Sequence, residues 1–472
     1  MKRLLCLLLT ALMLLSAAAC TANAQNAQTE AQPAAQPEGQ PENQTAEPED
    51  EPIELPELPV GEPDNLPDIG EPQPIENPPI ELTDPVKPIY ETEGKLPDVN
   101  GYGDFSNLLS ATLLSGKQNR NLSPISVYLA LAMLTEGAKG DTQAELLKLL
   151  GCKDVKELRT VCGGMLETLS IREENSTLEL CDSLWMADEI NGTPVVFHDD
   201  YLKTLADTYR SEANAVKFGE LSAAKQIADW INEKTRGKIN VKPQDMNFDA
   251  STLAVLINTI YLKDNWAQTF TPENTEPGTF DGLNGEMTVD YMRRFDDGGV
   301  IRQGDGWIAY RVYLSWVGYV TFVLPDEGVA LDSLLGTPEA IDKLLHAGIE
   351  KSCDVSLWIP KFKFQDKMEL SEILKALGLK LSFTPDADFS GISDVPCAVD
   401  SVLQESYIGV DENGVEAAAY TMISVKATSF NPVEREKIDF HLTRPFFYAI
   451  ETRDGTVLFI GTVTEPSVSG QN

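Results

Sequence analysis

The chain has 472 residues, which is more than one ordinary domain needs, so one large domain or two ordinary ones are expected. Its 74 acidic side chains outnumber 37 basic ones, and the net charge of −37 would repel a phosphate backbone, so nucleic acid is not an expected partner. Seven cysteines without a CxxC pair or metal-ligand spacing, and only three histidines (His198, His346 and His441), predict neither a disulfide framework nor a metal site, and no cofactor is implied.

Residues 1–20 read as a secretory leader. Lys2 and Arg3 precede an apolar run over residues 4–15, which is too short for a permanent transmembrane helix. Four small residues then lead to Cys20. This ending resembles a bacterial lipobox, in which Cys20 would carry lipid and anchor the protein at the cell surface, although Ala17 stands where such signals prefer leucine. Plain secretion after cleavage at an Ala-x-Ala site is the alternative.

Residues 21–95 form a low-complexity segment rich in Pro, Glu, Gln and Ala. It carries 18 acidic residues against two lysines, Lys87 and Lys95. Few apolar side chains, frequent proline and charge repulsion leave nothing to offset the entropy lost on ordering. We therefore predict an extended disordered tether, which would reach on the order of 200 Å.

A globular domain is predicted for residues 96–472. It opens with an amphipathic stretch over residues 107–114. A buried helix follows, because Ser123-Pro124 is a typical helix start and Gly137 a typical stop. A shorter helix is expected at 142–150.

The next part alternates strands with helices, and then becomes rich in strands. Strands are predicted at 178–187 and 215–218, and helices at 201–209 and at 223–235, where Trp230 and Ile231 face inward. An apolar strand over 255–270 has Asn258 in its middle, and a buried asparagine without a partner would cost about 1–3 kcal/mol. The remaining expected elements are strands at 288–292, 307–313, 319–325 and 355–364, a helix at 370–377 ended by Gly378, and a hairpin of 446–450 with 456–463.

The stretch 409–428 has the period of a strand. Asn413-Gly414 forms a flexible joint before it. From there one side of the pattern has no charge at all, while both charges lie on the other side, so one face is expected to be buried. An Ala-rich helical turn is the alternative. The uncharged side comprises Val415, Ala417, Ala419, Thr421, Ile423, Val425 and Ala427.

Several of these motifs resemble the serpin family, in the family's order. Residues 412–419 (ENGVEAAA) are similar to the hinge of its inhibitory members, with valine where threonine is usual, and 440–447 (FHLTRPFF) to the segment after the reactive loop. The run from Asn121 resembles the segment with two serines beneath the central sheet. The strand with Asn258 resembles the one that ends in a tryptophan near the top of that sheet. The resemblance covers residues 96–466.

The resemblance implies an α+β serpin fold: a large central mixed sheet, further sheets, surrounding helices and an exposed reactive-centre loop. It implies a suicide-substrate inhibitor, not an enzyme, that traps a serine protease as a covalent acyl complex, by insertion of the cut loop into the sheet. A monomer is expected. The hinge would comprise Glu412, Gly414, Val415, Glu416, Ala417, Ala418 and Ala419. The sheet-opening region would comprise Ser123, Ser126, Asn258, Trp266 and Gln404.

The usual interval from Gly414 places the cut bond at Thr428-Ser429, with Lys426 and Ala427 as alternatives. Small side chains there favour an elastase-like or subtilisin-like protease, whereas Lys426 would suit a trypsin-like one.

Gln404 stands where the family often has a histidine bonded to Asn258, and an amide could keep that bond. The serine hydroxyls are expected to serve Asn258 as well. A non-inhibitory surface binding protein with the serpin fold is the alternative function. A hydrolase is disfavoured, because no Gly-x-Ser-x-Gly elbow occurs.

Overall fold

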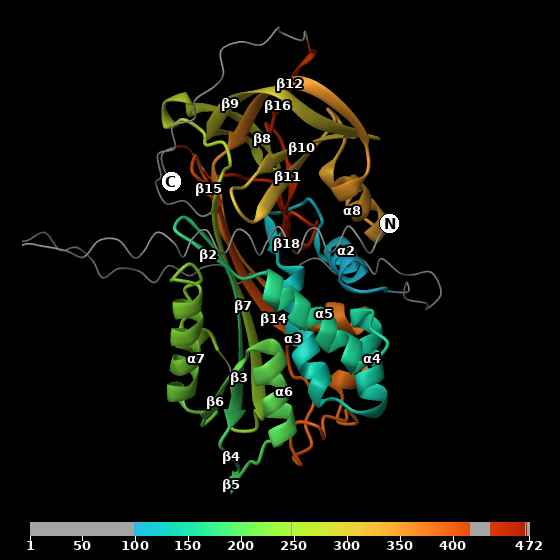
Figure 1. Ribbon diagram of the computed structural model, residues 1–472. Coiled ribbons are helices and arrows are strands. Elements are labelled where there is room, and N and C mark those ends of the chain that lie inside the picture. Colours follow the sequence, from blue (N-terminus) through green and yellow to red (C-terminus); the bar gives the residue numbers. More distant parts are fainter. Residues whose placement is uncertain (1–98, 247, 416–434, 468, 470–472) are drawn as a thin grey trace, which may run out of the picture. The chain divides into compact units, whose positions relative to one another are not determined.

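The computed structural model (Figure 1) describes residues 99–246, 248–415, 435–467 and 469. The chain divides into two units, Met1–Leu82 and Thr83–Asn472, and all described residues belong to the second. The leader with Cys20, the tether, hinge residues Glu416, Ala417, Ala418 and Ala419, and the predicted cut bond with Lys426, Ala427, Thr428 and Ser429 lie outside the described residues. No helix in the described ranges is long and apolar enough to span a membrane.

The larger sheet of the described part has nine strands, in the order β1-β18-β17-β11-β10-β9-β12-β16, with β8 paired to β9. All its pairs are antiparallel except β12 with β16, so the sheet is mixed. The strands are β1 (Arg120–Leu122), β8 (Glu276–Gly282), β9 (Gly285–Gly304), β10 (Trp307–Tyr313), β11 (Gly318–Pro325), β12 (Ile349–Pro360), β16 (Lys437–His441), β17 (Phe446–Thr452) and β18 (Val457–Val463).

The second sheet has seven strands in the described ranges, in the order β13-β14-β15-β7-β3-β2, with β6 parallel to β3. It contains Gly414 and Val415 of the predicted hinge and the strand with Asn258. The strands are β2 (Ile171–Glu173), β3 (Ser176–Ala187), β6 (Glu212–Val216), β7 (Ala254–Asn265), β13 (Phe362–Glu369), β14 (Leu403–Val410) and β15 (Gly414–Val415). A separate short ribbon joins β4 (Glu189–Ile190) to β5 (Thr193–Pro194).

Helices pack against these sheets. The helix α3 contacts both β7 and β18, and nearly all its residues are buried, as its uniformly apolar sequence predicts. In Figure 1 α7 lies alongside β3 and β7. The α-helices are α2 (Tyr102–Leu113), α3 (Pro124–Gly137), α4 (Gly140–Leu150), α5 (Val155–Thr168), α6 (Asp199–Tyr209), α7 (Leu221–Lys234), α8 (Pro338–His346) and α9 (Ser371–Ala376). Short 3-10 turns are Pro243–Asp245, Pro272–Asn274, Leu331–Leu334 and Leu381–Phe383.

One predicted strand is wrong in its extent. The alternating run 355–364 is two strands in two different sheets, since β12 ends at Pro360 beside β9 and β13 begins at Phe362 beside β14. Each sheet buries one face, so the alternation continues across the change of sheet and does not reveal it. The strand predicted at 255–270 likewise ends earlier, at Asn265, and Trp266 forms a separate bridge with Leu314.

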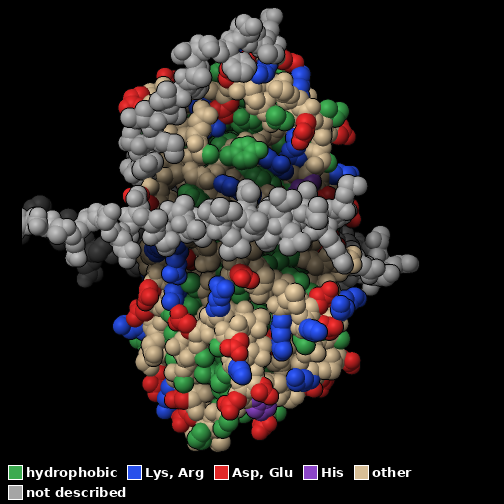
Figure 2. All heavy atoms as spheres, viewed as in Figure 1, with side chains coloured by type: hydrophobic (Ala, Val, Ile, Leu, Met, Phe, Trp, Pro, Cys, Tyr) green, Lys and Arg blue, Asp and Glu red, His purple; other side chains and the backbone are tan. Residues whose placement is uncertain are grey.

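The face of the domain that Figure 2 shows has charges of both signs. On the face shown in Figure 2, Lys and Arg side chains lie among Asp and Glu side chains.

Candidate functional site

The start of the predicted hinge strand is already part of the second sheet. The strand β15 lies between β14 and β7: Val415 pairs with Val410 on one side and with Asp264 on the other. Its side chain is 2% exposed. Among the described residues, β14 and β7 are joined only through these two residues of β15. The sheet therefore holds the beginning of an additional central strand.

Glycine is required at position 414, because β15 lies very close to the backbone of β7 there. A Cβ atom at Gly414 would lie 2.0 Å from the carbonyl oxygen of Asp264, a distance that no packing change relieves. The turn before it is closed by the Asp411 amide, which donates to the Gly414 carbonyl at 3.1 Å. The Asp411 carboxylate also accepts from the Asn413 amide at 2.8 Å. The joint expected at Asn413-Gly414 is thus a tight turn in which glycine permits the backbone contact with β7.

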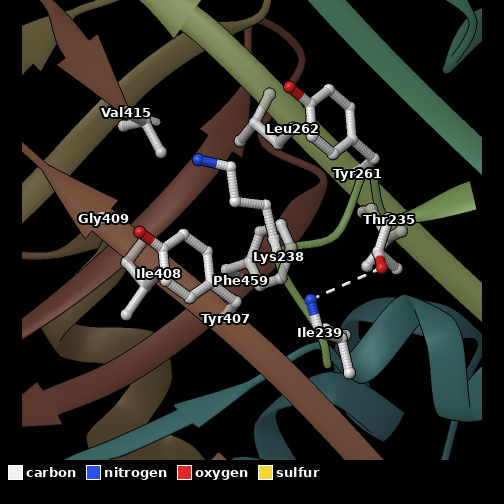
Figure 3. Close-up of a pocket in the computed structure, with 11 residues that line it drawn as sticks. Thr235, Lys238, Ile239, Tyr261, Leu262, Tyr407, Ile408, Gly409, Val415 and Phe459 are labelled. Atoms are coloured by element: carbon white, nitrogen blue, oxygen red, sulfur yellow. Dashed lines mark hydrogen bonds between the residues drawn. The ribbon is translucent and has the colours of Figure 1, made fainter. Parts of the chain in front are cut away.

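A pocket continues the line of β15 between the two strands (Figure 3). Its walls are residues 260–262 of β7 and 407–409 of β14, with Val415 at one end. The segment after α7 contacts both walls: the Arg236 guanidinium lies 4.3 Å from the Tyr261 ring centroid, and the Lys238 ammonium 5.5 Å from that of Tyr407. A strand that entered here would therefore meet apolar side chains and the residues that follow α7.

Trp266 holds the hinge turn at the end of β7. Its ring is fully buried, and its indole Nε1 donates to the Asp411 carbonyl at 2.8 Å. Its backbone amide donates to the Asn413 carbonyl at 2.8 Å, and the Phe270 amide donates to the Glu412 carbonyl at 3.1 Å. These three bonds fix the turn beside the point where β15 enters.

Glu412 adds a nearly buried ion pair. Its carboxylate lies 3.1 Å from the Lys361 ammonium and accepts from the Thr275 hydroxyl at 2.8 Å. Burial alone would raise the pKa of Glu412, but a backbone hydrogen bond, Thr275 and Lys361 together hold it below its ordinary value. The pair links the hinge turn to the junction of β12 and β13.

Replacing Glu412 by Gln should lower the free energy of unfolding by about 1–2 kcal/mol, because Lys361 then stays nearly buried without its anion. Urea unfolding followed by circular dichroism measures this change. The matched control is Glu372→Gln, which removes the more exposed pair with Lys375 and should change stability by less than about 0.5 kcal/mol. Equal effects of the two substitutions would contradict a special role for the hinge pair.

Two serines and Gln404 come together where α3 meets β14. The Gln404 side chain accepts from the Ser123 amide at 3.1 Å and donates to the Ser123 carbonyl at 2.7 Å. The Ser126 hydroxyl donates to the Ser123 hydroxyl at 3.1 Å. Gln404 thus ties β14 to the start of α3.

The expected partners of Asn258 are wrong. Its amide nitrogen donates to Asp182 Oδ1 at 2.8 Å, and its own oxygen has no partner among the described residues. Gln404 is engaged by the backbone of Ser123, because the N–H groups at a helix start have no partner within the helix and the Ser123 N–H donates to the glutamine oxygen. Asn258 and Gln404 therefore lie in separate hydrogen-bond groups.

Sequence reasoning missed two buried acids. Asp182 lies on β3 opposite Asn258, and Asp264 lies on β7 opposite Val415. Asp264 is fully buried; it accepts from the Ser176 hydroxyl and from the amides of Trp316 at 3.0 Å and Val317 at 2.7 Å. The available signal was the alternation: each carboxylate stands on the side of its strand whose other residues are largely apolar, where a charge is costly unless it has a partner.

His441 does not form a hydrolytic triad with its neighbours. Its Nε2 lies 2.9 Å from the Ser356 hydroxyl and 3.9 Å from Asp439 Oδ1, so both groups approach the same nitrogen. A triad has serine and carboxylate on opposite nitrogens. The ring is also stacked on Trp358 at 4.0 Å between centroids. This histidine packs the surface of β12 and β16.

Comparisons with known proteins agree with this geometry. The family model described as "Serpin (serine protease inhibitor)" matches residues 101–466. An uncharacterized serpin-like protein of Thermococcus kodakarensis is 30% identical over 379 residues, which are 78% of this chain and 86% of that relative. Serpin A3-5 of Bos taurus is 30% identical over 376 residues, 77% of this chain and 88% of the relative. The chain belongs to the serpin family.

Solved structures confirm the serpin fold. The thermophilic serpin tengpin in its native state is similar with a TM-score of 0.66 and 25% identity, over 79% of this chain and 96% of tengpin. Thyroxine-binding globulin in complex with thyroxine has the same fold, with a TM-score of 0.66 and 22% identity, over 78% and 98% of the two chains. The predicted α+β serpin architecture is therefore confirmed. The second of these structures contains bound thyroxine, so in that protein the fold carries a small-molecule ligand.

Proposed function

We propose that this serpin inhibits serine endopeptidases as a suicide substrate, and is not itself an enzyme. The observation that carries the proposal is the position of β15 between β14 and β7. These two strands have no other connection among the described residues, so β15 is the start of a central strand. Insertion of a cut loop at such a place is a form of strand addition that serpins use.

The register at Val415 supports complete insertion. Continued in the same antiparallel register, the next inward residues would be Ala417, opposite Leu262 and Ile408, and Ala419, opposite Ile260 and Ser406. Leu262, Ile408 and Ser406 are all buried. Small uncharged residues can enter this site without burying a charge. The uncharged side of the hinge sequence is thus the side that the sheet would bury.

In the proposed reaction, the hydroxyl of the protease's serine attacks the carbonyl carbon of Thr428. An ester forms between the two proteins, the Thr428–Ser429 peptide bond breaks, and the amine of Ser429 leaves with a proton. The freed strand then enters the sheet and carries the protease with it before water can hydrolyse the ester. Deformation of the protease would make the trap permanent.

We propose that the targets are elastase-like or subtilisin-like enzymes, which have small apolar pockets. Val425, Ala427 and Thr428 suit such pockets, and Lys426 would suit a trypsin-like enzyme if the cut bond lies two residues earlier.

We also propose that the protein acts outside the cell as a monomer, held at a bacterial surface by lipid on Cys20. The lipobox-like sequence supports the anchor, and the acidic, proline-rich residues 21–95 would separate the inhibitor from the membrane.

The proposal predicts a covalent complex. The purified protein mixed with an elastase-like protease should give a band that resists SDS, at the summed mass of the protease and the cut serpin. Mass spectrometry of the released C-terminal peptide identifies the cut bond. The same protease with its serine blocked should give no such band. Cleavage products alone, across elastase-like, subtilisin-like and trypsin-like enzymes, would overturn inhibition and favour a non-inhibitory binding protein.

A further inference from the structure

A buried acid and a buried amide lie directly opposite each other in the sheet that receives the loop. Asp182 of β3 pairs in register with Asn258 of β7, the strand that forms one wall of the pocket beneath β15. The Asp182 side chain accepts one hydrogen bond from Asn258, at 2.8 Å. Asp182 Oδ2 and Asn258 Oδ1 are both buried and have no partner in the described part of the chain. Nothing in the proposed inhibitory reaction uses Asp182.

One proton on Asp182 would give both unpaired oxygens a hydrogen bond. An ionised Asp182 can only accept hydrogen bonds. Asp182 Oδ2 and Asn258 Oδ1 are then left without a donor, and a negative charge is buried. A neutral Asp182 carries a hydrogen on Oδ2 that can be donated to Asn258 Oδ1, while Oδ1 continues to accept from the asparagine. The acid and the amide then form a cyclic pair of two hydrogen bonds. Burial raises the pKa of Asp182 to about 7, although the bond from Asn258 acts in the opposite direction.

The groups around Asp182 give the charge no compensation. Cys162 of α5 faces it, and burial raises the pKa of this thiol far above its ordinary value, so it stays neutral. Beyond Cys162 lie Tyr209 and Glu136, and Arg159 beside them is bound to the Glu136 carboxylate at 2.6 Å. Residues 254–262 of β7 carry no charged side chain. Burial keeps neighbouring Cys181 on β3 neutral, and the cation that acts on Cys181, Lys234, is bound to the Glu212 carboxylate at 2.7 Å.

We propose that Asp182 and Asn258 form a proton-dependent latch in the sheet that accepts the reactive loop. The neutral pair holds β7 on β3 with every polar atom bonded. Loss of the proton leaves a buried charge and an unserved amide oxygen in the uncut protein, and so weakens the strand that borders the pocket. The consequence for regulation rests on the proposed inhibitory function: above neutral pH the uncut inhibitor would lose activity faster, whereas mildly acidic conditions would preserve it.

The sign follows from linkage. The pKa of the carboxyl in the folded protein is above its value in the unfolded chain, so the folded state binds more protons between the two values. The contribution of Asp182 to stability is therefore present at low pH, is lost as pH rises toward the folded pKa, and stays lost above it.

The test compares Asp182→Asn with the wild type in thermal unfolding. Asparagine is permanently neutral and can both donate to Asn258 Oδ1 and accept from its amide, so it imitates the protonated acid. At about pH 8 we expect the variant to unfold at a higher temperature than the wild type. At about pH 5.5 the difference between the two unfolding temperatures should be smaller by about 3 °C. Asp207→Asn, which removes an exposed carboxylate from α6, should show no such trend.

A variant that is less stable than the wild type at both pH values would overturn the latch, because it would mean that the charge itself is needed. If the variant does not fold, infrared titration of the wild type decides the question: a neutral-carboxyl band should disappear as pH rises through neutrality. Glu451→Gln removes the band of a second buried acid, whose pKa burial raises to about 6, and Asp264→Asn removes that of Asp264, whose pKa burial also raises. A carboxyl that is ionised throughout this range would also overturn the proposal. None of these measurements requires a protease, so failure to inhibit would leave their result unaffected.

Discussion

Cleavage of the peptide chain within residues 416–434 is expected to raise the midpoint of thermal unfolding by on the order of 10–20 °C. The cut frees the residues after Val415 to continue β15 between β14 and β7. About ten new backbone hydrogen bonds, each worth roughly 1 kcal/mol, would form along with burial of the uncharged side. For a domain of this size, each kcal/mol corresponds to roughly 1–2 °C.

Differential scanning calorimetry of the intact and cut proteins measures this gain. A metalloprotease is the suitable reagent, because it cuts without forming an acyl ester and so is not trapped. As a control, a cut within residues 21–95 should leave the unfolding temperature unchanged. If cleavage after Val415 also leaves it unchanged, the uncut sheet has no strand to gain, and the inhibitory mechanism proposed for this serpin is wrong.

Much of the fold follows from local signals. The helix α3 has the ends predicted for it, because Pro124 fits the first helical turn and Gly137 is a typical stop. The apolar alternation of β3 and β7 likewise predicted strands at those positions. Pairing between distant strands is different, since the pattern of a strand records which face is buried but not which neighbour buries it. This is why the passage from β12 to β13 was predicted as one strand.

In the candidate site, too, local signals predicted burial but not the partners of polar residues. The uncharged side of the hinge sequence predicts that Val415 faces inward, and the structure buries it. The partners of the polar residues were not predictable, because they come from far along the chain: Lys361 for Glu412, and Asp182 for Asn258. Gln404 bonds to the backbone of Ser123, and an N–H without a helical partner at a helix start leaves no trace in side-chain patterns.

Replacing Val415 by Glu should convert the inhibitor into a substrate. The new carboxylate would lie between Val410 and Asp264, in a position that is 2% exposed in the wild type. Asp264 is itself buried, and its pKa is raised by that burial despite hydrogen bonds from Ser176 and two amides, so it cannot neutralise a second acid. In the uncut variant the carboxylate would keep residue 415 out of the sheet, so the several kcal/mol needed to bury it beside Asp264 would oppose insertion. Each 1.4 kcal/mol slows insertion about tenfold relative to hydrolysis of the ester. Arginine is the weaker choice, because it could form an ion pair with Asp264.

The measurement is the ratio of SDS-resistant complex to cut serpin on a gel, from which the number of inhibitor molecules consumed per trapped protease follows. We expect this number to rise at least ~100-fold for Val415→Glu and to stay near the wild-type value for Val415→Thr, which keeps a β-branched, uncharged side chain. Circular dichroism of both uncut variants separates slow insertion from a failure to fold. Once cut, the Glu variant should also gain less thermal resistance than the Thr variant, because the same buried carboxylate opposes insertion in both experiments. Efficient trapping by a folded Val415→Glu protein would mean that residue 415 is outside the sheet when the protease is captured. The trap would then not depend on the strand that β15 begins.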